Sequence, residues 1–205
     1  MEKKKILWDA DEVLIKTTPA FDAYLNQKFN LNLKYEDHIT FDLTELLRMS
    51  ESEIKKEERL FYETDFYLNI EAKEGAHEVI DYLSESYGHL IATGRSISDE
   101  KHLHLTLDRL FKPHHFSSVH HMGGEHGYSL KKQKWEKCRE EGAGLVIDDY
   151  HKTVFNAANN GVHAILMTAP WNKGLTDLPK LVSRARNMYE AVEVIERKAK
   201  IIWPE

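Results

Sequence analysis

Two aspartates separated by one residue, Asp9 and Asp11, directly follow the apolar run at 6–8. Where a chain turns out of a sheet, carboxylates at this spacing can both face a ligand. One could attack the phosphorus of a phosphate ester, while the other protonates the leaving oxygen and then deprotonates the attacking water. The pair indicates phosphate-monoester hydrolysis through an aspartyl-phosphate, with Asp9 as nucleophile and Asp11 as acid/base. Asp-x-Asp is also common in surface turns.

A second polar group, Thr93-Gly94-Arg95, follows the apolar run at 89–92. A threonine hydroxyl and the backbone N–H groups after it can hold phosphoryl oxygens. Gly94 would allow the backbone to approach the ligand closely. We therefore expect these three residues to bind substrate, the alternative being an ordinary strand-to-helix turn with a capping residue.

Asp148 and Asp149 follow a third apolar run, at 145–147. Adjacent carboxylates at the end of a buried strand repel each other unless a cation relieves them. An anionic nucleophile that approaches an anionic phosphoryl group needs a cation too, and Mg²⁺ prefers carboxylate oxygens. The sequence thus predicts a Mg²⁺ site that includes this pair.

A lysine ahead of that run could neutralise the nucleophile and the phosphate. The residues alone leave the choice open, because most lysines at the start of a helix form a solvated face. The candidates are Lys131, Lys132, Lys134 and Lys137.

The elements that must position these groups are short strands alternating with helical patterns, which is typical of an α/β fold with a mainly parallel sheet. In such sheets ligands bind at the carboxyl ends of the strands. Asp9, Thr93 and Asp148 should therefore meet at one rim, although they lie far apart in the sequence. The expected strands lie at 6–8, 89–92, 116–120, 145–147 and 164–167.

Helices are expected between these strands. Thr18-Pro19 is a start signal for a helix that carries Phe21, Tyr24, Leu25 and Phe29 on one face. Further helices are expected at 75–86 and 135–141, and Asn187 with Glu190 predicts a capping box for a helix at 191–198.

The segment between Asp11 and Thr93 is much longer than the roughly thirty residues that a direct crossover needs. The excess, 17–71, is acidic, rich in aromatic residues and helical in pattern. We expect it to form a small helical cap over the rim, with 1–16 and 72–205 as the core. The alternative is a set of extra helices packed against the sheet.

Composition limits the partners and the compartment. The chain has 205 residues and a net charge of −6, so a nucleic-acid polymer, which needs basic surface, is not an expected partner. A small phosphorylated substrate is. No apolar run reaches the roughly eighteen residues of a membrane span, and the single cysteine, Cys138, permits no intramolecular disulfide. A cytoplasmic protein without membrane association is expected. The oligomeric state is unknown.

The order Asp-x-Asp, Thr, Lys, Asp-Asp on successive strand ends resembles the haloacid dehalogenase (HAD) superfamily, a Rossmann-like fold with mostly phosphatase members. The resemblance implies that Asp9 is nucleophile and metal ligand, and that Asp11 is acid/base and offers its backbone carbonyl to Mg²⁺. It also implies that Thr93 binds phosphate and that Asp148 and Asp149 complete the metal site. The lysine that matches the pattern is Lys134, with Lys131 and Lys132 as alternatives.

A closer resemblance is to the 5'(3')-deoxyribonucleotidase-like branch. It is carried by 146–149, by the run 164–166 with Pro170-Trp171-Asn172 after it, and by Arg186-Asn187. The chain departs from the branch at Glu12, where a glycine is usual, and at Thr93-Gly94-Arg95, where Thr-Ser is usual. Both departures put the nucleotide substrate in doubt.

Three functional hypotheses remain open. A nucleoside monophosphate is the leading substrate, another small phosphorylated metabolite is the second, and a catalytically silent HAD-fold binding or regulatory protein is the third. A nucleic-acid 3'-phosphatase is disfavoured by the acidic charge. Seven of the twelve histidines fall between His102 and His126, and we expect them, like Trp171 and Asn172, to serve surface and packing rather than a site.

Overall fold

The computed structural model describes residues 3–124, 127–130 and 132–204, and its centre is one seven-stranded sheet in the order β4-β3-β2-β1-β5-β6-β7. All neighbouring strands are parallel except β3 and β4, which are antiparallel. The predicted Rossmann-like α/β fold is therefore confirmed. The strands are β1 (Lys4–Trp8), β2 (Tyr87–Ser96), β3 (Phe116–Gly124), β4 (Gly127–Leu130), β5 (Ala143–Asp148), β6 (His163–Met167) and β7 (Val182–Ala185).

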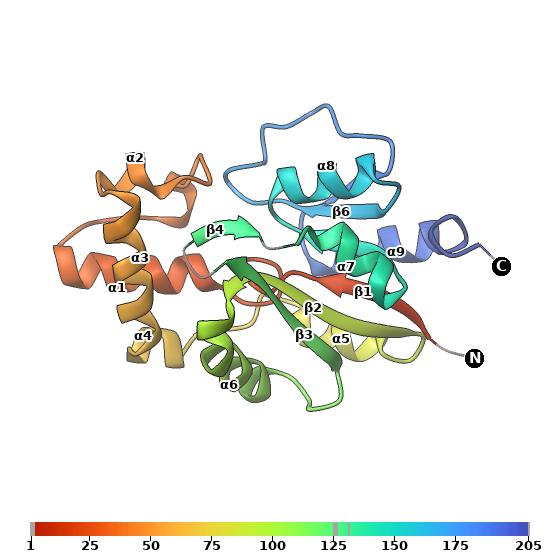
Figure 1. Cartoon of the computed structure of the whole chain (residues 1–205), viewed down its shortest axis with the longest axis horizontal. Coiled ribbons are helices and arrows are strands. Elements are labelled where there is room, and N and C mark those ends of the chain that lie inside the picture. Colours follow the sequence, from red (N-terminus) through yellow and green to blue (C-terminus); the bar gives the residue numbers. More distant parts are fainter. Residues whose placement is uncertain (1–2, 125–126, 131, 205) are drawn as a thin grey trace.

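Helices cover both faces of the sheet (Figure 1). Side chains of a strand alternate between faces, so Ile6 and Trp8 pack on one side and Leu7 on the other, all fully buried. Burial on both sides explains why β1 reads as an unbroken apolar run. The helices on the face of Ile6 are α5 (Ala76–Leu83), α6 (Glu100–Leu110) and α9 (Met188–Ile202), and those on the face of Leu7 are α7 (Lys134–Glu141) and α8 (His151–Asn159).

The order of the strands reverses at β1, which lies between β2 and β5. Leu7 is in register with Leu90 on one side and with Val146 on the other. The Asp9 N–H donates to the carbonyl of Ile147 at 2.8 Å, so the pairing of β1 with β5 extends to the first aspartate. Such a reversal opens a crevice at the carboxyl ends of the strands, and Asp9 enters it beside Asp148.

The segment between β1 and α5 is helical, as its pattern indicates. In Figure 1 its helices lie at the left end of the molecule, and both termini lie at the opposite end. Aromatic rings hold the helices together, with Phe61 5.2 Å from Phe21 and 5.4 Å from Tyr67 between ring centroids. Its division from the core at 17–71 as a separate cap stays a prediction. The helices are α1 (Thr17–Phe29), α2 (Leu43–Leu47), α3 (Glu51–Tyr62) and α4 (Asp65–Leu68), with a 3₁₀ turn at Tyr35–Asp37.

Some boundaries differ from those expected. Helix α1 begins at Thr17 after Lys16, so Thr18 is not its cap; the Thr18 N–H donates to Glu12 Oε1 at 2.7 Å instead. Phe29 was expected on the buried face but is exposed, because it closes the helix. Strands β4 and β7 were not predicted, since each has only four residues.

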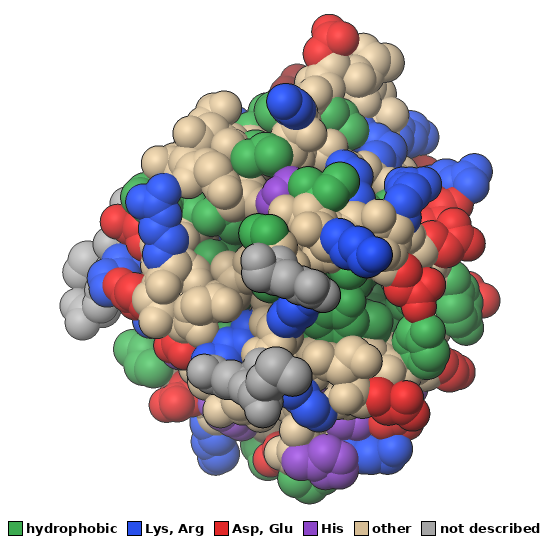
Figure 2. All heavy atoms as spheres, turned by 90° about the vertical axis from the view of Figure 1, so that its right-hand side faces the viewer, with side chains coloured by type: hydrophobic (Ala, Val, Ile, Leu, Met, Phe, Trp, Pro, Cys, Tyr) green, Lys and Arg blue, Asp and Glu red, His purple; other side chains and the backbone are tan. Residues whose placement is uncertain are grey.

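At α9 only half of the capping box forms. Asn187 Oδ1 accepts from the Glu190 N–H at 2.9 Å, as expected, but the Glu190 carboxylate accepts from the backbone N–H of Arg186 at 2.8 Å. Within the residues described, no helix combines the length and apolarity that a membrane span requires. At the end that carries the termini, Figure 2 shows lysine and arginine side chains intermixed with acidic and apolar ones.

Candidate active site

The carboxylates of Asp9, Asp148 and Asp149 come together where β1 and β5 end. One oxygen from each lies within 4.8 Å of the others, and all three residues are buried. Lys134, the first residue of α7, donates from Nζ to Asp9 Oδ1 at 2.6 Å and to Asp148 Oδ2 at 2.7 Å. The predicted convergence of Asp9 with Asp148 and Asp149 is present, and among the described lysines it is Lys134 that reaches it.

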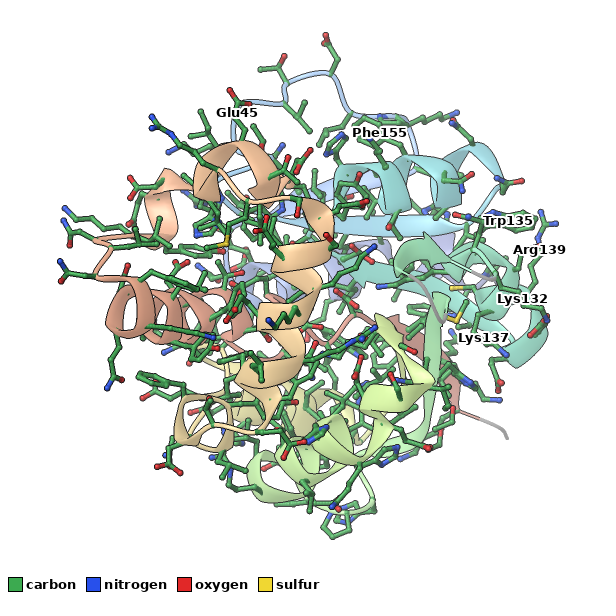
Figure 3. All side chains as sticks on the ribbon, turned by 60° about the vertical axis from the view of Figure 1, so that its left-hand side comes forward. Glu45, Lys132, Trp135, Lys137, Arg139 and Phe155 are labelled. Atoms are coloured by element: carbon green, nitrogen blue, oxygen red, sulfur yellow. The ribbon has the colours of Figure 1, made fainter. Side chains whose placement is uncertain are left out.

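The other candidate lysines are engaged elsewhere. Lys132 and Lys137 both pair with Glu140, the latter at 2.7 Å. Figure 3 shows both at the outer side of the molecule, together with Trp135 and Arg139 of α7. Lys131 lies outside the described residues. Helical periodicity explains the difference, since Lys134 and Cys138 form the buried side of α7.

The charges of this carboxylate cluster do not balance. Burial, then the nearby carboxylates of Asp148 and Asp11, raise the pKa of Asp9 to about 7 in spite of the lysine. Burial and the charges of Asp148 and Asp9 raise the pKa of Asp149 well above its usual value. One ammonium thus faces three carboxylates. A hard divalent cation with oxygen ligands would relieve the excess, so the donor set fits Mg²⁺.

Asp148 and Asp149 have different surroundings. Asp148 uses both oxygens within the protein, Oδ2 with Lys134 and Oδ1 with the Tyr150 N–H at 2.8 Å. Asp149 is held through its backbone carbonyl, which accepts from Asn172 Nδ2 at 2.7 Å and from Trp171 Nε1 at 3.3 Å. Asp148 therefore orients the lysine, while the carboxyl group of Asp149 is left available to a ligand, and a bound cation would favour its ionised form.

Asp11 has a full set of partners. Arg95 grips it as a fork, from Nε to Oδ2 at 2.9 Å and from Nη2 to Oδ1 at 2.6 Å, and the Thr17 hydroxyl also donates to Oδ1. Burial acts to raise the pKa of Asp11, but the guanidinium and these hydrogen bonds hold it below the usual value. Arg95, predicted to bind substrate, faces the predicted acid/base, and its contact with substrate stays a prediction.

Arg95 also connects β2 to the inserted helices. Its guanidinium carbon lies 5.1 Å from the ring centroid of Tyr62 and 5.3 Å from that of Tyr67, and Nη1 donates to the Tyr67 hydroxyl at 2.5 Å. Stacking on two rings suits a planar guanidinium. The position of Asp11 thus depends on α3 and α4 as well as on the sheet.

Thr93 and Gly94 lie within β2, which continues to Ser96 rather than ending at Thr93. The Thr93 hydroxyl is buried and accepts from the Arg95 N–H at 3.2 Å. Gly94 is exposed, and a Cβ there would meet nothing within 4 Å. The approach of the Gly94 backbone to a ligand stays a prediction. Within the protein, a close backbone contact occurs at Gly123, where a Cβ would lie 2.3 Å from the Gly94 carbonyl oxygen.

Comparison with known proteins identifies the family. A protein-family model described as "5' nucleotidase, deoxy (Pyrimidine), cytosolic type C protein" matches residues 3–202. The chain belongs to this nucleotidase family. A Bacillus subtilis (strain 168) protein named "Putative nucleotidase YqfW" is 26% identical over 184 residues, which cover 87% of each chain.

Solved structures agree on the fold of this nucleotidase family member. A haloacid dehalogenase-like protein from Agrobacterium tumefaciens superimposes with a TM-score of 0.66 at 16% identity, covering 96% of this chain and 99% of the other. A second from Streptococcus pneumoniae gives 0.65 at 13%, covering 94% and 98%. YfnB from Bacillus subtilis, solved bound to magnesium, gives 0.61 at 14%, covering 96% and 100%. The chain is thus a HAD-type phosphatase close to the nucleotidase branch.

Glu12 departs from the family pattern, and the structure of this family member accommodates it. Its φ of 57° lies in the left-handed region, which explains why glycine is usual there. Its carboxylate turns to Lys73 Nζ at 3.1 Å and to the Thr18 N–H at 2.7 Å. The bulky anion is therefore paired.

Sequence reasoning missed or undervalued several positioning residues of this phosphatase. Thr17 and Lys73 carried no motif. Asn172 was expected to pack, yet it is buried and spans two strand ends, donating to the carbonyls of Asp149 and of Met167, the latter at 2.8 Å, and accepting from Arg184. The signal available was its place after the strand of Met167, within Pro170-Trp171-Asn172.

Proposed function

We propose that the protein is a Mg²⁺-dependent phosphate-monoester hydrolase that works through an aspartyl-phosphate on Asp9, with a nucleoside monophosphate as its leading substrate. The observation that carries the proposal is the bridge from Lys134 to both Asp9 and Asp148, with Asp149 in the same cluster. Burying more carboxylates than cations costs free energy unless a ligand supplies positive charge. Such a cluster therefore suits a metal-assisted phosphoryl transfer.

Asp9 is the nucleophile in this proposal. Lys134 holds Oδ1, which leaves Oδ2 for phosphorus. The Asp9 side chain is 11% exposed against 2% for Asp148, so of these two it is Asp9 that an incoming phosphate can reach. Attack forms the bond between Oδ2 and phosphorus and breaks the bond between phosphorus and the leaving oxygen.

Mg²⁺ would be held by the carboxylates of Asp9 and Asp149 and the backbone carbonyl of Asp11, with Asp148 completing the site. When bound, it supplies the positive charge that lets an anionic nucleophile approach an anionic phosphoryl group. Lys134 adds a fixed second positive charge, because burial, which lowers the pKa of a lysine, is outweighed by the charges of Asp148 and Asp9.

Asp11 transfers the protons. In the first step it gives a proton to the leaving oxygen, and in the second it takes one from the water that attacks phosphorus and frees Asp9. A proton donor needs a higher pKa than the Arg95 fork allows. A phosphoryl group near Thr93 and Gly94 would compete with Asp11 for the Arg95 guanidinium. The hydrogen bonds from Arg95 to Asp11 would then weaken, and the pKa of the Asp11 carboxyl would rise while substrate is bound.

Aromatic residues beside the cluster favour a substrate that carries a ring. Phe41 stacks on Tyr150, the residue after Asp149, with 4.2 Å between ring centroids. Trp171 lies 5.9 Å from both Phe41 and Tyr35. Phe41 and Tyr35 come from the inserted segment, so a base held among these rings would be read by residues outside the sheet.

The test of the chemistry is Mg²⁺-dependent hydrolysis of an aryl phosphate by Asp9→Asn beside Asp108→Asn. Asp108 lies on the exposed side of α6 and serves as the matched control. We expect no activity in the first, full activity in the control, and phosphate on the Asp9 peptide of the wild type after an acid quench. Activity that survives Asp9→Asn would exclude the mechanism, and an inactive wild type would indicate a silent binding protein.

The test of the substrate is a panel of nucleoside monophosphates and sugar phosphates on wild type and Phe41→Ala. We expect the substitution to raise KM for nucleotides about tenfold while leaving KM for sugar phosphates within about twofold, because only the stacking of the base is lost. Equal rates on sugar phosphates and nucleotides would favour a phosphatase of another small metabolite.

A further inference from the structure

A second group of potential metal ligands lies outside the active site, among the histidines that the sequence left without a role. Glu100 and His104 are one helical turn apart on α6, and His121 is on β3. One ligand atom from each lies within 4.8 Å of the others. His104 Nε2 is 3.8 Å from Glu100 Oε1, and the rings of His104 and His121 are 6.3 Å apart between centroids.

His121 is the least exposed part of this trio. Both of its ring nitrogens are buried, and neither makes a hydrogen bond of good geometry within the part of the chain that the structure describes. The Ser96 backbone lies close enough to one of them to favour a proton there, which would leave the other nitrogen for a ligand. Burial lowers the pKa of His121, so the ring is neutral near pH 7 and keeps a lone pair for a ligand. A buried polar atom without a partner costs free energy, and a bound ion would remove part of that cost.

The other two ligands are accessible from solvent. The side chain of His104 is 44% exposed and that of Glu100 is 53% exposed, so an ion can reach them without opening the fold. Their helix is fixed against the sheet by Leu103 and Leu107, both buried. The trio is therefore held on two rigid elements, with one anchored ligand and two that can adjust.

Two imidazoles and one carboxylate form a donor set for Zn²⁺ or a similar late transition metal rather than for Mg²⁺. Metal–ligand bonds of about 2.0 Å place tetrahedral ligand atoms about 3.3 Å apart. The ligand atoms of the trio lie within 4.8 Å of one another, so side-chain rotation of the exposed His104 and Glu100 must close at most about 1.5 Å. Arg95, whose charge acts on His121, is already neutralised by its fork on Asp11.

We propose that Glu100, His104 and His121 form a binding site for Zn²⁺, separate from the carboxylate cluster of the active site. His121 is in register with Thr93 of β2, so an ion here would lie on the strand adjoining the one that carries the predicted phosphate-binding residues. A water molecule would complete the coordination.

The test is titration of the metal-free full-length protein with Zn²⁺ by calorimetry, and with Co²⁺ by visible absorption, in saturating Mg²⁺. We expect one equivalent to bind and a tetrahedral Co²⁺ spectrum in the wild type. His104→Ala and His121→Ala should each weaken binding at least tenfold, because loss of even an outer-sphere partner costs about 10- to 100-fold. His104 is exposed, so its variant will fold even if the His121 variant does not.

Two controls separate this site from other sources of binding. His114→Ala removes an exposed histidine outside the trio and should leave the affinity unchanged. Asp149→Asn should leave it unchanged too, whether or not the variant hydrolyses phosphate. The proposal would be overturned if the wild type did not bind Zn²⁺, or if His104→Ala and Glu100→Gln both bound it with wild-type affinity. Loss of Zn²⁺ binding in Asp149→Asn would overturn it as well.

Discussion

Asp9 and Asp11 are two residues apart in the sequence, yet their surroundings are electrostatically opposite. Asp9 shares one lysine with Asp148 and lies beside Asp149. Burial, and after it the charges of Asp148 and Asp11, raise the pKa of Asp9 to about 7. Asp11 has an arginine to itself, and the pKa of its carboxyl is lowered although burial acts to raise it. The first region lacks positive charge and the second does not.

This difference shows which function each region can perform. A carboxylate that lacks positive charge can bind a cation and then attack an anion, whereas one that is held by an arginine changes its proton affinity when that arginine moves. Perturbations of the two regions should therefore have different signatures.

The largest effect is expected from the lysine of the first region. Lys134→Met should lower turnover about 10³-fold, since it removes the fixed charge that contacts Asp9 and Asp148. Lys132→Met is the matched control, because this lysine pairs with Glu140 at the surface, and it should stay within about twofold. Lys131→Met is also expected to matter little. Steady-state rates of aryl phosphate hydrolysis measure these effects. If Lys131→Met lost activity while Lys134→Met kept it, the role of the catalytic lysine would pass to Lys131.

The next effect is a dependence of stability on pH and Mg²⁺. The folded pKa of Asp9, about 7, exceeds the ordinary value of 3.8, so its protonation stabilises the fold below about pH 4 and this stabilisation is lost as pH rises through about 7. The loss is on the order of 4 kcal/mol without metal. Mg²⁺ should therefore raise Tm more at about pH 8 than at about pH 5.5. An equal rise at both pH values, or the same pH dependence in Asp9→Asn, would contradict this.

A smaller effect, about 10²-fold in kcat/KM, is expected for Arg95→Met in the second region. Without the guanidinium the pKa of Asp11 rises, so the acid keeps its proton to higher pH. The alkaline limb of the pH–rate profile should then move to higher pH than in the wild type. Arg139→Met, which removes an arginine lying over Trp135 at 4.8 Å, should leave the profile in place. An unmoved limb in Arg95→Met would separate Arg95 from proton transfer.

The smallest effect is expected at Glu12, between the two regions. Glu12→Gly loses the contacts to Lys73 and the Thr18 N–H but relieves a left-handed backbone, so we expect stability within about 1 kcal/mol of the wild type and nearly unchanged turnover. Lys73→Met leaves the buried Glu12 carboxylate without its lysine. It should lower the free energy of unfolding, measured in urea, by about 1–3 kcal/mol. Restored or increased turnover in Glu12→Gly would show that Glu12 restrains the site.

The strand ends were predictable because burial on both faces makes a strand a short apolar run, and a carboxylate that ends such a run marks the rim. The positions of Asp9 and Asp148 follow from that rule, whereas the order of the strands came from the structure. Lys134 needed the family pattern, since four lysines offered the same charge. Strands β4 and β7 were too short to show a period of two.

By itself, the sequence determined the α/β fold, the rim at which it gathers carboxylates, and the excess negative charge that calls for a cation, because these depend on local periodicity and on residues next to strand ends. Only the tertiary structure decided that Arg95 turns to Asp11 between two tyrosines, that Asn172 holds Asp149, and that His121 meets Glu100 and His104. Those contacts join elements far apart in the chain, and their geometry comes from packing, which no local pattern encodes.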